Sequence, residues 1–257
     1  MTQGITFIIP VLDDLRVIKC IESIRRFDDT DNCVILLMAG KSSDEFGVEV
    51  VKHLKPRDSL NRTPDNGLFD ALNKGLELAA TPLIGWLGAD DFLSKNLLAS
   101  SVMSEFTGAV DAVVYSTAYY QGDTVTRVLD SRFAKKPYLN WGFHNPHFST
   151  FLTKELSNSA SFKIHAVSKN QFADITYFSE VLSKANITTK PIVAVYMSEG
   201  GVGSGSFKSV LVNFRGRYNL FKTQYSAPRA ALMVMINYCW KVSSKFSNRV
   251  AGKKVEF

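Results

Sequence analysis

Short apolar runs alternate with amphipathic stretches along the first 110 residues of the chain. Three runs have the length and composition of buried strands, and they cover residues 6–11, 33–38 and 83–87. The stretches between and after them predict helices over residues 15–24, 48–54, 68–79 and 94–106. This alternation predicts an α/β fold with a mainly parallel central sheet flanked by helices.

The second half of the chain has a more β-rich pattern. Residues 111–119 and 124–129 predict two strands, joined by the hairpin signal Gln121-Gly122-Asp123. Beyond them, the pattern predicts a helix over residues 171–185 and a strand over residues 191–197.

Ligands of parallel α/β sheets bind at the carboxyl ends of the strands. In this chain those ends are predicted at residues 10–14, 39–44 and 88–91. The second of these loops contains Gly40-Lys41-Ser42, but Ile35 stands where a P-loop needs its first glycine. No G-x-G-x-x-G follows the first strand, so a dinucleotide-binding enzyme is disfavoured as well.

Positive charge is concentrated at the C-terminal end. The 257 residues carry a net charge of +6, and residues 207–257 contain ten Lys and Arg but one acidic residue. We therefore divide the chain into a domain of residues 1–206, with halves at about 1–110 and 111–206, and a basic helical tail of residues 207–257. Three widely spaced cysteines and an N-terminus without a signal sequence predict a cytoplasmic protein.

Two adjacent carboxylates, Asp90 and Asp91, follow the third predicted strand. Such a pair is costly there unless it binds a cation or accepts hydrogen bonds. Oxygen ligands suit Mg²⁺ or Mn²⁺, which can bridge to a diphosphate. An acidic pair that stabilises a helix N-terminus is the alternative, and this fragment alone does not separate the two.

The segment from Thr63 to Gly75 is the second signal. By itself it predicts a turn followed by a helix with an Asp70–Lys74 pair at i,i+4. Together with the acidic pair, however, the segment TPDNGLFDALNKG resembles the D-x-G-(I/L)-(Y/F)-D-A-(L/M)-N-K-G stretch of family-2 glycosyltransferases, especially bacterial ones that build surface polysaccharides. Weaker matches follow in the family's order at residues 145–151, 172–177 and 200–202, so the resemblance spans about residues 4–206.

This resemblance implies a GT-A fold and a role for each matching residue. It implies that Asp90 and Asp91 bind Mn²⁺ or Mg²⁺ and that Asp174 is the general base for the acceptor hydroxyl. It implies that the donor is bound by Pro10, Asp65, Asp70, Asn73, Lys74, Asp90 and His147. Two alternatives stay open, because Glu180 lies near Asp174 in the sequence and His147 can equally be a loop histidine packed among aromatic residues.

The implied reaction is sugar transfer, with inversion, from a nucleotide-diphosphate sugar, with a UDP-sugar favoured. The implied acceptor is a hydroxyl of a glycan or of a polyprenyl-diphosphate-linked glycan, in O-antigen, capsule or similar polysaccharide synthesis. Three positions depart from the family pattern. Ala39 stands where the family has an aspartate that contacts the nucleobase, Gly88 stands where it has an acid or asparagine, and Thr63 stands where it has a glutamate. They keep open a degenerate, non-catalytic glycosyltransferase-like protein that binds nucleotides or serves in assembly.

The tail predicts a helix over residues 228–250. Its apolar side consists of Leu232, Met235, Ile236, Cys239 and Trp240. This block is shorter than the roughly 20 residues that span a bilayer, so the helix suits the membrane interface. The resemblance points the same way, to a peripheral protein at the inner face of the cell membrane. The alternative is packing on the domain or on a second subunit of a homo-oligomer; the apolar block argues against a nucleic-acid-binding arm.

Overall fold

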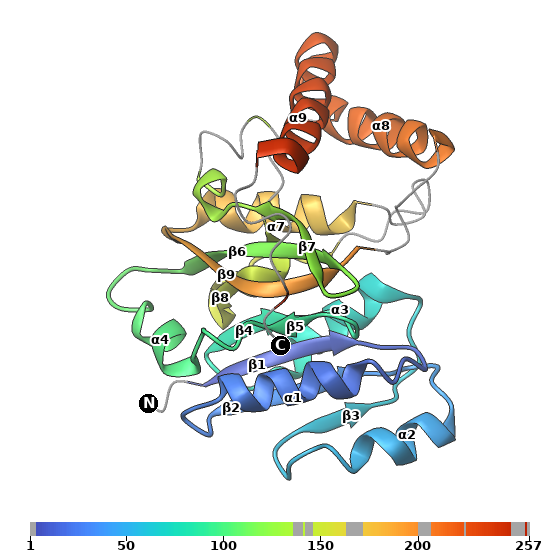
Figure 1. Cartoon of the computed structure of the whole chain (residues 1–257), viewed down its shortest axis with the longest axis vertical. Helices are drawn as coiled ribbons and strands as arrows, with labels where there is room; N and C mark the ends of the chain where they lie inside the picture. Colours follow the sequence, from blue (N-terminus) through green and yellow to red (C-terminus); the bar gives the residue numbers. More distant parts are fainter. Residues whose placement is uncertain are drawn as a thin grey trace.

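In the computed structural model, one sheet runs through the molecule and helices cover both of its faces (Figure 1). The structure describes residues 4–135, 141, 146–162, 172–199, 207–223, 225–247 and 255. Within these residues the sheet has nine strands in the order β3-β2-β1-β4-β8-β6-β9-β5, and β7 pairs with β6. The predicted α/β fold with a central sheet flanked by helices is confirmed.

The first half of the chain forms the parallel part of the sheet. Its strands are β1 (Ile5–Pro10), β2 (Cys33–Met38), β3 (Ser59–Asn61) and β4 (Leu83–Trp86). The helices between them are α1 (Val17–Phe27), α2 (Asp44–Val51) and α3 (Leu68–Leu78). Because β1 pairs in parallel with both β2 and β4, the carboxyl ends of these strands lie at the same edge.

Two helices of the first half differ from the prediction. The helix expected over residues 94–106 is confined to α4 (Ala99–Ser104), after a short strand β5 (Phe92–Leu93). The Ser94 N–H donates to the Ala194 carbonyl at 2.8 Å, so the sheet holds this stretch extended and delays the helix. α2 begins before residue 48 because the Ser43 hydroxyl accepts a hydrogen bond from the Phe46 N–H and caps the helix.

The second half adds strands that form antiparallel pairs, together with a long parallel pair of β6 and β9, so the whole sheet is mixed. These strands are β6 (Ala112–Gln121), β7 (Thr124–Leu129), β8 (Thr150–Thr153) and β9 (Ile187–Ser198). The helical segments are η1 (Ser131–Phe133), η2 (His147–Ser149), α6 (Lys154–Ser157) and α7 (Ala173–Lys184). β6 and β7 form the predicted hairpin, and its turn uses Gly122 at a φ of 58°, which favours glycine. β8 runs antiparallel between β4 and β6 and joins the two halves.

Alternate residues of β1 belong to two different cores. Phe7 packs edge-on against Phe27 of α1 and Phe151 of β8, with ring centroids 5.6 and 6.0 Å apart. Ile8 lies in the other cluster and contacts Gly75 of α3. Because both faces of β1 are buried, this strand has the continuous apolar sequence of a central parallel strand and fixes the position of the loop that follows it.

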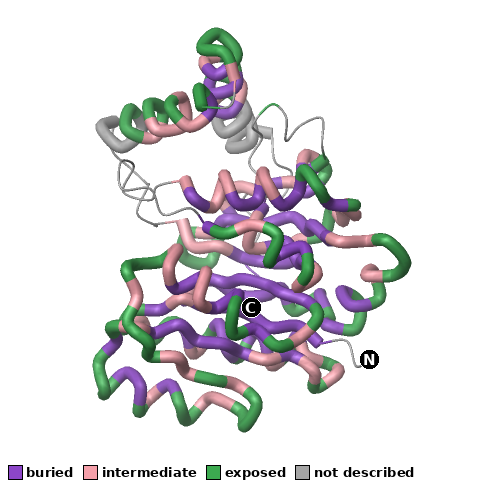
Figure 2. The backbone as a smooth tube through the Cα atoms, turned by 180° about the vertical axis from the view of Figure 1, so that it is seen from behind, coloured by how far each residue is buried: buried purple, intermediate pink, exposed green. Residues whose placement is uncertain are grey.

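The tail forms a hairpin of two helices, α8 (Phe207–Lys222) and α9 (Ala227–Ser247), at one end of the molecule (Figure 1). The two helices pack on each other through Phe221, Ala230, Met233 and Val234. Most of their other described residues are exposed or half-buried (Figure 2). None of the helices in the described part of the chain is long and apolar enough to cross a membrane.

Candidate active site

Loops follow the carboxyl ends of β1, β2 and β4, and hydrogen bonds connect them. The first loop folds onto the second through Asp13, whose carboxylate accepts hydrogen bonds from the N–H and the hydroxyl of Ser43, both at 2.8 Å. Asp13 has a left-handed φ of 48°, a conformation that aspartate tolerates better than most residues. The predicted ligand edge of the sheet is therefore a connected set of loops.

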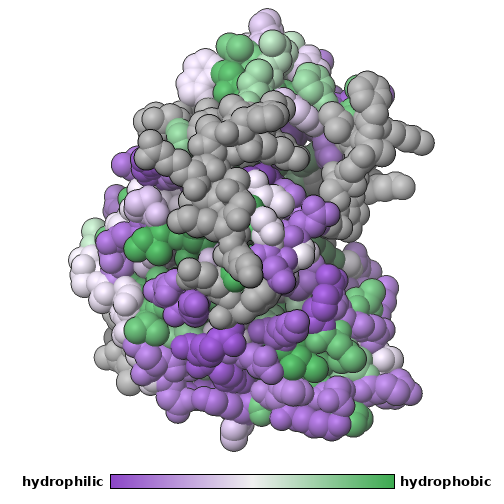
Figure 3. All heavy atoms as spheres, in the orientation of Figure 1, coloured by the Kyte–Doolittle hydropathy of each residue, from purple (hydrophilic) through white to green (hydrophobic). Residues whose placement is uncertain are grey.

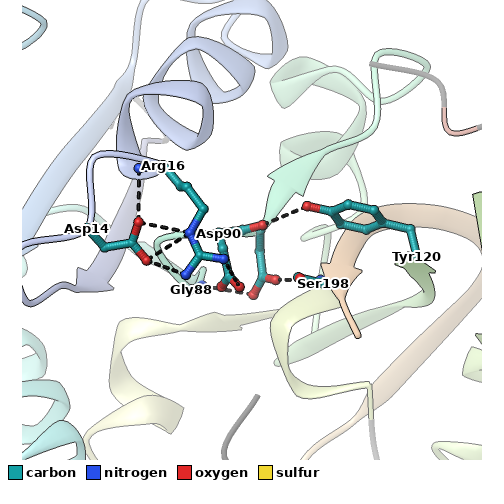
Figure 4. A network of polar contacts seen from close by, with 7 residues as sticks. Asp14, Arg16, Gly88, Asp90, Tyr120 and Ser198 are labelled. Carbon is teal, nitrogen blue, oxygen red and sulfur yellow. Dashed lines mark hydrogen bonds and ion pairs between the residues drawn. The ribbon is translucent and has the colours of Figure 1, made fainter. Parts of the chain in front are cut away.

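Arg16 connects the first loop to the loop after β4 (Figure 4). Its guanidinium donates to the Asp14 carboxylate from Nε at 2.9 Å and from Nη2 at 2.6 Å, and to Asp90 from Nη1 at 3.1 Å. The hydrogen bond from Arg16 lowers the pKa of Asp14. The Asp90 side chain is 31% exposed, so a ligand from solvent can reach it.

Asp91 is buried directly after Asp90. Its oxygens accept hydrogen bonds from the backbone N–H groups of Ser198 at 3.2 Å and Gly88 at 3.1 Å (Figure 4). Burial, and then the charge of Asp90, raises the pKa of Asp91 to about 7. A Cβ atom at residue 88 would lie 2.6 Å from Asp91 Oδ2, so the glycine makes room for this carboxylate.

The acidic pair fits a cation that takes most of its ligands from a substrate. No group of three or more His, Cys, Asp and Glu side chains suited to a metal lies among the described residues. Mg²⁺-type sites commonly use one or two carboxylates together with substrate phosphates and water. Within the described part of the chain no hydrogen bond reaches Asp90 Oδ1, and Asp91 is a carboxyl group that burial makes costly to ionise. A divalent cation would stabilise both charges.

Two further predicted residues, Asp65 and Asp70, hold the loop before α3. Asp65 Oδ1 accepts a hydrogen bond from the Gly67 N–H at 2.9 Å, and Oδ2 lies so close to Gly40 that a side chain there would overlap it. Asp70 accepts a hydrogen bond from Lys74 Nζ at 2.9 Å, which lowers the pKa of Asp70. Asp65 therefore places a carboxylate against the loop at the end of β2.

The other predicted donor-binding residues of the first half are engaged within the protein. Both polar atoms of the Asn73 side chain pair with the backbone of Phe162, at 2.9 and 2.8 Å. Lys74 also donates to the Pro64 carbonyl at 2.7 Å. Pro10 ends β1 and is half-buried. These residues shape the loops at the site, and their contact with a donor stays a prediction.

A second group of polar side chains lies at the start of α7. Asp174 is in the first turn of this helix, and its Oδ2 is 4.0 Å from His147 Nε2. The His147 ring packs against Phe178 of the same helix, with centroids 5.7 Å apart. Glu180, the alternative base, lies farther along α7 and pairs with Lys184 at 3.5 Å. The carboxylate that faces His147 is therefore that of Asp174.

β6 connects the two groups of carboxylates. The charges of Asp91 and Asp174 both act on the buried phenol of Tyr119, whose pKa is raised mainly by burial. The hydroxyl of the next residue, Tyr120, donates to the Asp90 carbonyl at 3.0 Å (Figure 4). The acidic pair therefore contacts β6 directly, and Asp174 is close enough for its charge to act on the same strand.

Sequence reasoning missed several residues of this site. Arg16 had a local signal, since it is a cation in a loop that follows a predicted strand. Ser198 and Tyr120 had none, because only the pairing of distant strands brings them to the acidic pair. Asn145 and the predicted match at residues 200–202 lie outside the described residues.

Comparison with known proteins gives one family. The family model described as glycosyl transferase family 2 matches residues 6–170. A PGL/p-HBAD biosynthesis glycosyltransferase of Mycobacterium tuberculosis and one of Mycobacterium bovis are each 32% identical to the chain over 91 residues. The alignment covers 34% of the chain and 36% of each relative, so the chain spans about a third of the length of the curated relatives it matches.

Solved structures resemble nearly the whole chain. S. aureus TarS, residues 1–349, superposes with a TM-score of 0.63 at 14% sequence identity and covers 96% of this chain and 75% of that chain. TarS in complex with UDP-GlcNAc superposes with a TM-score of 0.60 at 15% sequence identity and covers 95% of this chain and 74% of that chain. The mannosyltransferase PcManGT from Pyrobaculum calidifontis, in complex with GDP-Man and Mn²⁺, superposes with a TM-score of 0.58 at 15% sequence identity. It covers 96% of this chain and 74% of that chain. At these identities the likeness shows the fold alone.

Proposed function

This chain belongs to glycosyl transferase family 2 and has the GT-A fold, and from that premise we propose that it transfers a sugar from a nucleotide-diphosphate sugar to an acceptor hydroxyl, with inversion at the anomeric carbon. One observation carries the proposal: a buried carboxyl, Asp91, is tied to the end of β9 through the Ser198 N–H, and a second carboxylate, Asp174, faces His147. The first carboxyl group suits a diphosphate held through a cation, and the second suits proton transfer.

We assign the donor to the loops after β1, β2 and β4. Mn²⁺ or Mg²⁺ held by Asp90 and Asp91 would neutralise charge on the leaving diphosphate. Arg16, already paired with Asp90, supplies a fixed positive charge beside the same group. Asp65, which lies against Gly40, offers a carboxylate to the nucleobase next to Ala39, where the family pattern has an aspartate.

We assign the general base to Asp174. Its carboxylate takes the proton of the acceptor hydroxyl while the hydroxyl oxygen attacks the anomeric carbon. The bond from that carbon to the diphosphate oxygen breaks, and the nucleoside diphosphate leaves with the electron pair. His147 Nε2, 4.0 Å from Asp174 Oδ2, would stabilise the negative charge of this carboxylate when the imidazole is protonated. The attacking oxygen and the leaving group lie on opposite sides of the sugar, so its configuration inverts.

For the substrates, we favour a UDP-sugar and a glycan or polyprenyl-diphosphate-linked acceptor in the synthesis of O-antigen, capsule or a similar polysaccharide. The UDP-GlcNAc complex of S. aureus TarS supports this donor, whereas PcManGT binds GDP-Man, so both nucleotides belong in a binding screen. Exposed apolar side chains on α8 and α9 support association with the inner face of the cell membrane.

Two variants separate donor binding from chemistry. Titration calorimetry with UDP or GDP and Mn²⁺ measures donor-site binding, and release of UDP or GDP from the matching nucleotide-sugar measures turnover. Asp91→Asn should weaken metal-dependent nucleotide binding at least ~10-fold, because one carboxylate ligand is lost. Asp174→Asn should keep nucleotide affinity and lower turnover roughly 10²-fold or more, the usual effect of losing a general base.

Glu180→Gln is the matched control for Asp174, because it removes a carboxylate from the same helix. It should leave both measurements unchanged. Nucleotide binding by Asp91→Asn equal to that of wild type contradicts the donor assignment, and near-normal turnover by Asp174→Asn contradicts the base. Failure of the wild type to bind either nucleotide in Mn²⁺ removes the proposed function altogether.

A further inference from the structure

The tail helix α8 is packed onto the start of α7, where Asp174 lies. A Cβ atom at Gly216, in the middle of α8, would overlap the ring of Phe172, the residue directly before α7. Glycine inside a helix is less favourable than alanine, so this close contact gives the glycine a packing reason. The next residue of α8, Arg217, is half-buried, and its guanidinium carbon lies 5.8 Å from the centroid of the Phe172 ring.

Arg217 is a cation without a direct polar partner in the described part of the chain. The carboxylate of Asp174 and the phenols of Tyr238 and Tyr119 are near enough to act on its charge, but no described residue accepts a hydrogen bond from it. Burial lowers the pKa of Arg217, and the charge of Asp174 opposes this effect. A half-buried guanidinium from which no described residue accepts a hydrogen bond has N–H donors to offer to an anionic ligand.

We propose that Arg217 binds a phosphate group of the acceptor, beside Asp174. The inference rests on the proposed function, because it takes Asp174 as the base that receives the acceptor hydroxyl. A planar guanidinium fork matches two phosphate oxygens, which a neutral sugar does not offer. The acceptor side is favoured over the donor diphosphate, because Arg217 lies over Phe172, two residues before Asp174, whereas the acidic pair already has Arg16 on Asp90. Acceptors of this class are phosphate-linked glycans or glycans joined to a lipid through phosphate.

The test titrates inorganic phosphate into the full-length protein at constant ionic strength, with and without saturating UDP and Mg²⁺. Calorimetry and ³¹P line broadening measure the affinity without any need for turnover. Wild type should bind phosphate in both conditions, and Arg217→Gln at least ~10-fold more weakly, because a charge-assisted bidentate contact is lost. Arg215→Gln is the matched control, since Arg215 is exposed on the same helix, and it should behave as wild type. UDP affinity should be equal in all three proteins.

Each result has a separate meaning. Equal phosphate binding by wild type and Arg217→Gln overturns the inference, and so does phosphate binding that disappears once UDP fills the donor site, since Arg217 then contacts the donor. Arg217→Lys keeps the charge without the fork and should have an intermediate affinity, which guards against a general folding defect in Arg217→Gln. If the wild type binds phosphate through Arg217 but no nucleotide, the proposed function fails while the phosphate contact stands.

Discussion

At two glycines of the site, a carboxylate of another residue lies where a side chain would otherwise be. Asp91 Oδ2 occupies the place of a Cβ at Gly88 and accepts a hydrogen bond from its N–H at 3.1 Å. Asp65 occupies the corresponding place at Gly40. From the sequence, Gly88 is visible as a departure from the family pattern. Its cause is not visible, because it depends on where the carboxylate of Asp91 turns in the folded loop.

The raised pKa of Asp91 predicts a pH-dependent stability. This pKa is about 7 in the folded protein against an ordinary value of 3.8, so the folded state binds more protons between these values. The contribution of Asp91 to the free energy of unfolding is therefore fully present below about pH 4 and is lost as the pH rises to about 7. Relative to Asp91→Asn, the wild type should lose on the order of a few kcal/mol across this range. Urea unfolding at several pH values in EDTA measures that difference.

The size of the stability difference at any one pH carries no information about the pKa of Asp91, because the amide also changes the hydrogen bonds to Gly88 and Ser198. The slope against pH is the signal. An offset that does not vary with pH, or wild-type stability that increases relative to the variant from pH 4 to 7, contradicts the raised pKa. Added Mn²⁺ with UDP should reduce the slope, because a bound cation favours the ionised carboxylate.

At the scale of elements, the segment from residue 63 to the end of α3 shows how a motif combines structure with function. The ion pair between Asp70 and Lys74 that the sequence predicts is present at 2.9 Å, and Lys74 also holds the Pro64 carbonyl. Gly75 lies against Ile8 of β1 and brings α3 close to the sheet. Part of this motif therefore positions the loop that carries Asp65, whatever contacts the donor adds.

Gly75→Ala should destabilise the protein although alanine favours helices. The new methyl group would overlap Ile8 Cγ2, and overpacking in a core typically costs about 1–3 kcal/mol. Helix propensity alone predicts a gain of about 1 kcal/mol, so the two effects differ in sign. Glu77→Ala, at an exposed position of the same helix, is the control and should be neutral or slightly stabilising. Thermal or urea unfolding measures the stability of each variant against the wild type. A Gly75→Ala variant that is more stable than the wild type refutes the close contact.

The elements that the sequence predicts well are those that local pattern determines. β1, β2 and β4 are buried on both faces, so their apolar runs are continuous and need no knowledge of the partner strand. β5 was missed and α4 was predicted too long, because the decisive hydrogen bond, from Ser94 to Ala194, joins residues far apart in the chain. The acidic pair is predicted for the same local reason and stays a prediction as a metal site, whereas its backbone partner Ser198 depends on β9.

At the scale of the whole molecule, the candidate site lies where the two halves and the tail meet. The second half closes on the first through the hydrogen bonds from Ser198 to Asp91 and from Tyr120 to the Asp90 carbonyl. The tail adds Arg217 near Asp174. The donor half, the acceptor half and the tail are therefore not separate functional units in the fold, since each contributes a side chain or a backbone group to the surroundings of the candidate site.

The hairpin of α8 and α9 combines packing with an exposed apolar surface. Met233 and Val234 are buried against α8, which agrees with the alternative of a packed helix. Other large apolar side chains of the hairpin are exposed: Leu211, Val212, Phe214, Leu232 and Met235. Apolar atoms gather over this end of the molecule in the space-filling view (Figure 3). The side chain of Trp240, predicted to lie at the membrane boundary, is outside the described residues.

Removing the tail is a poor test of membrane binding, because Val255 near the chain end is buried beside Phe92 and its N–H donates to Asp123 at 2.9 Å. A double substitution, Leu232→Ser with Met235→Ser, leaves that contact intact and removes only exposed side chains. The same substitution at Leu78, an exposed leucine at the end of α3, is the matched control.

We expect the full-length protein to sediment with vesicles of phosphatidylglycerol and phosphatidylcholine at low salt, because apolar side chains enter the interface while basic residues meet anionic headgroups. The double variant should bind at least ~10-fold more weakly, since each fully buried side chain of this size contributes about 1.5–3 kcal/mol. Leu78→Ser should sediment as wild type does, and salt should weaken binding in every protein. A wild type that stays in the supernatant at low salt contradicts the membrane proposal. Analytical ultracentrifugation then decides whether the hairpin covers a second copy of the chain, since the double variant would shift a dimer toward monomer.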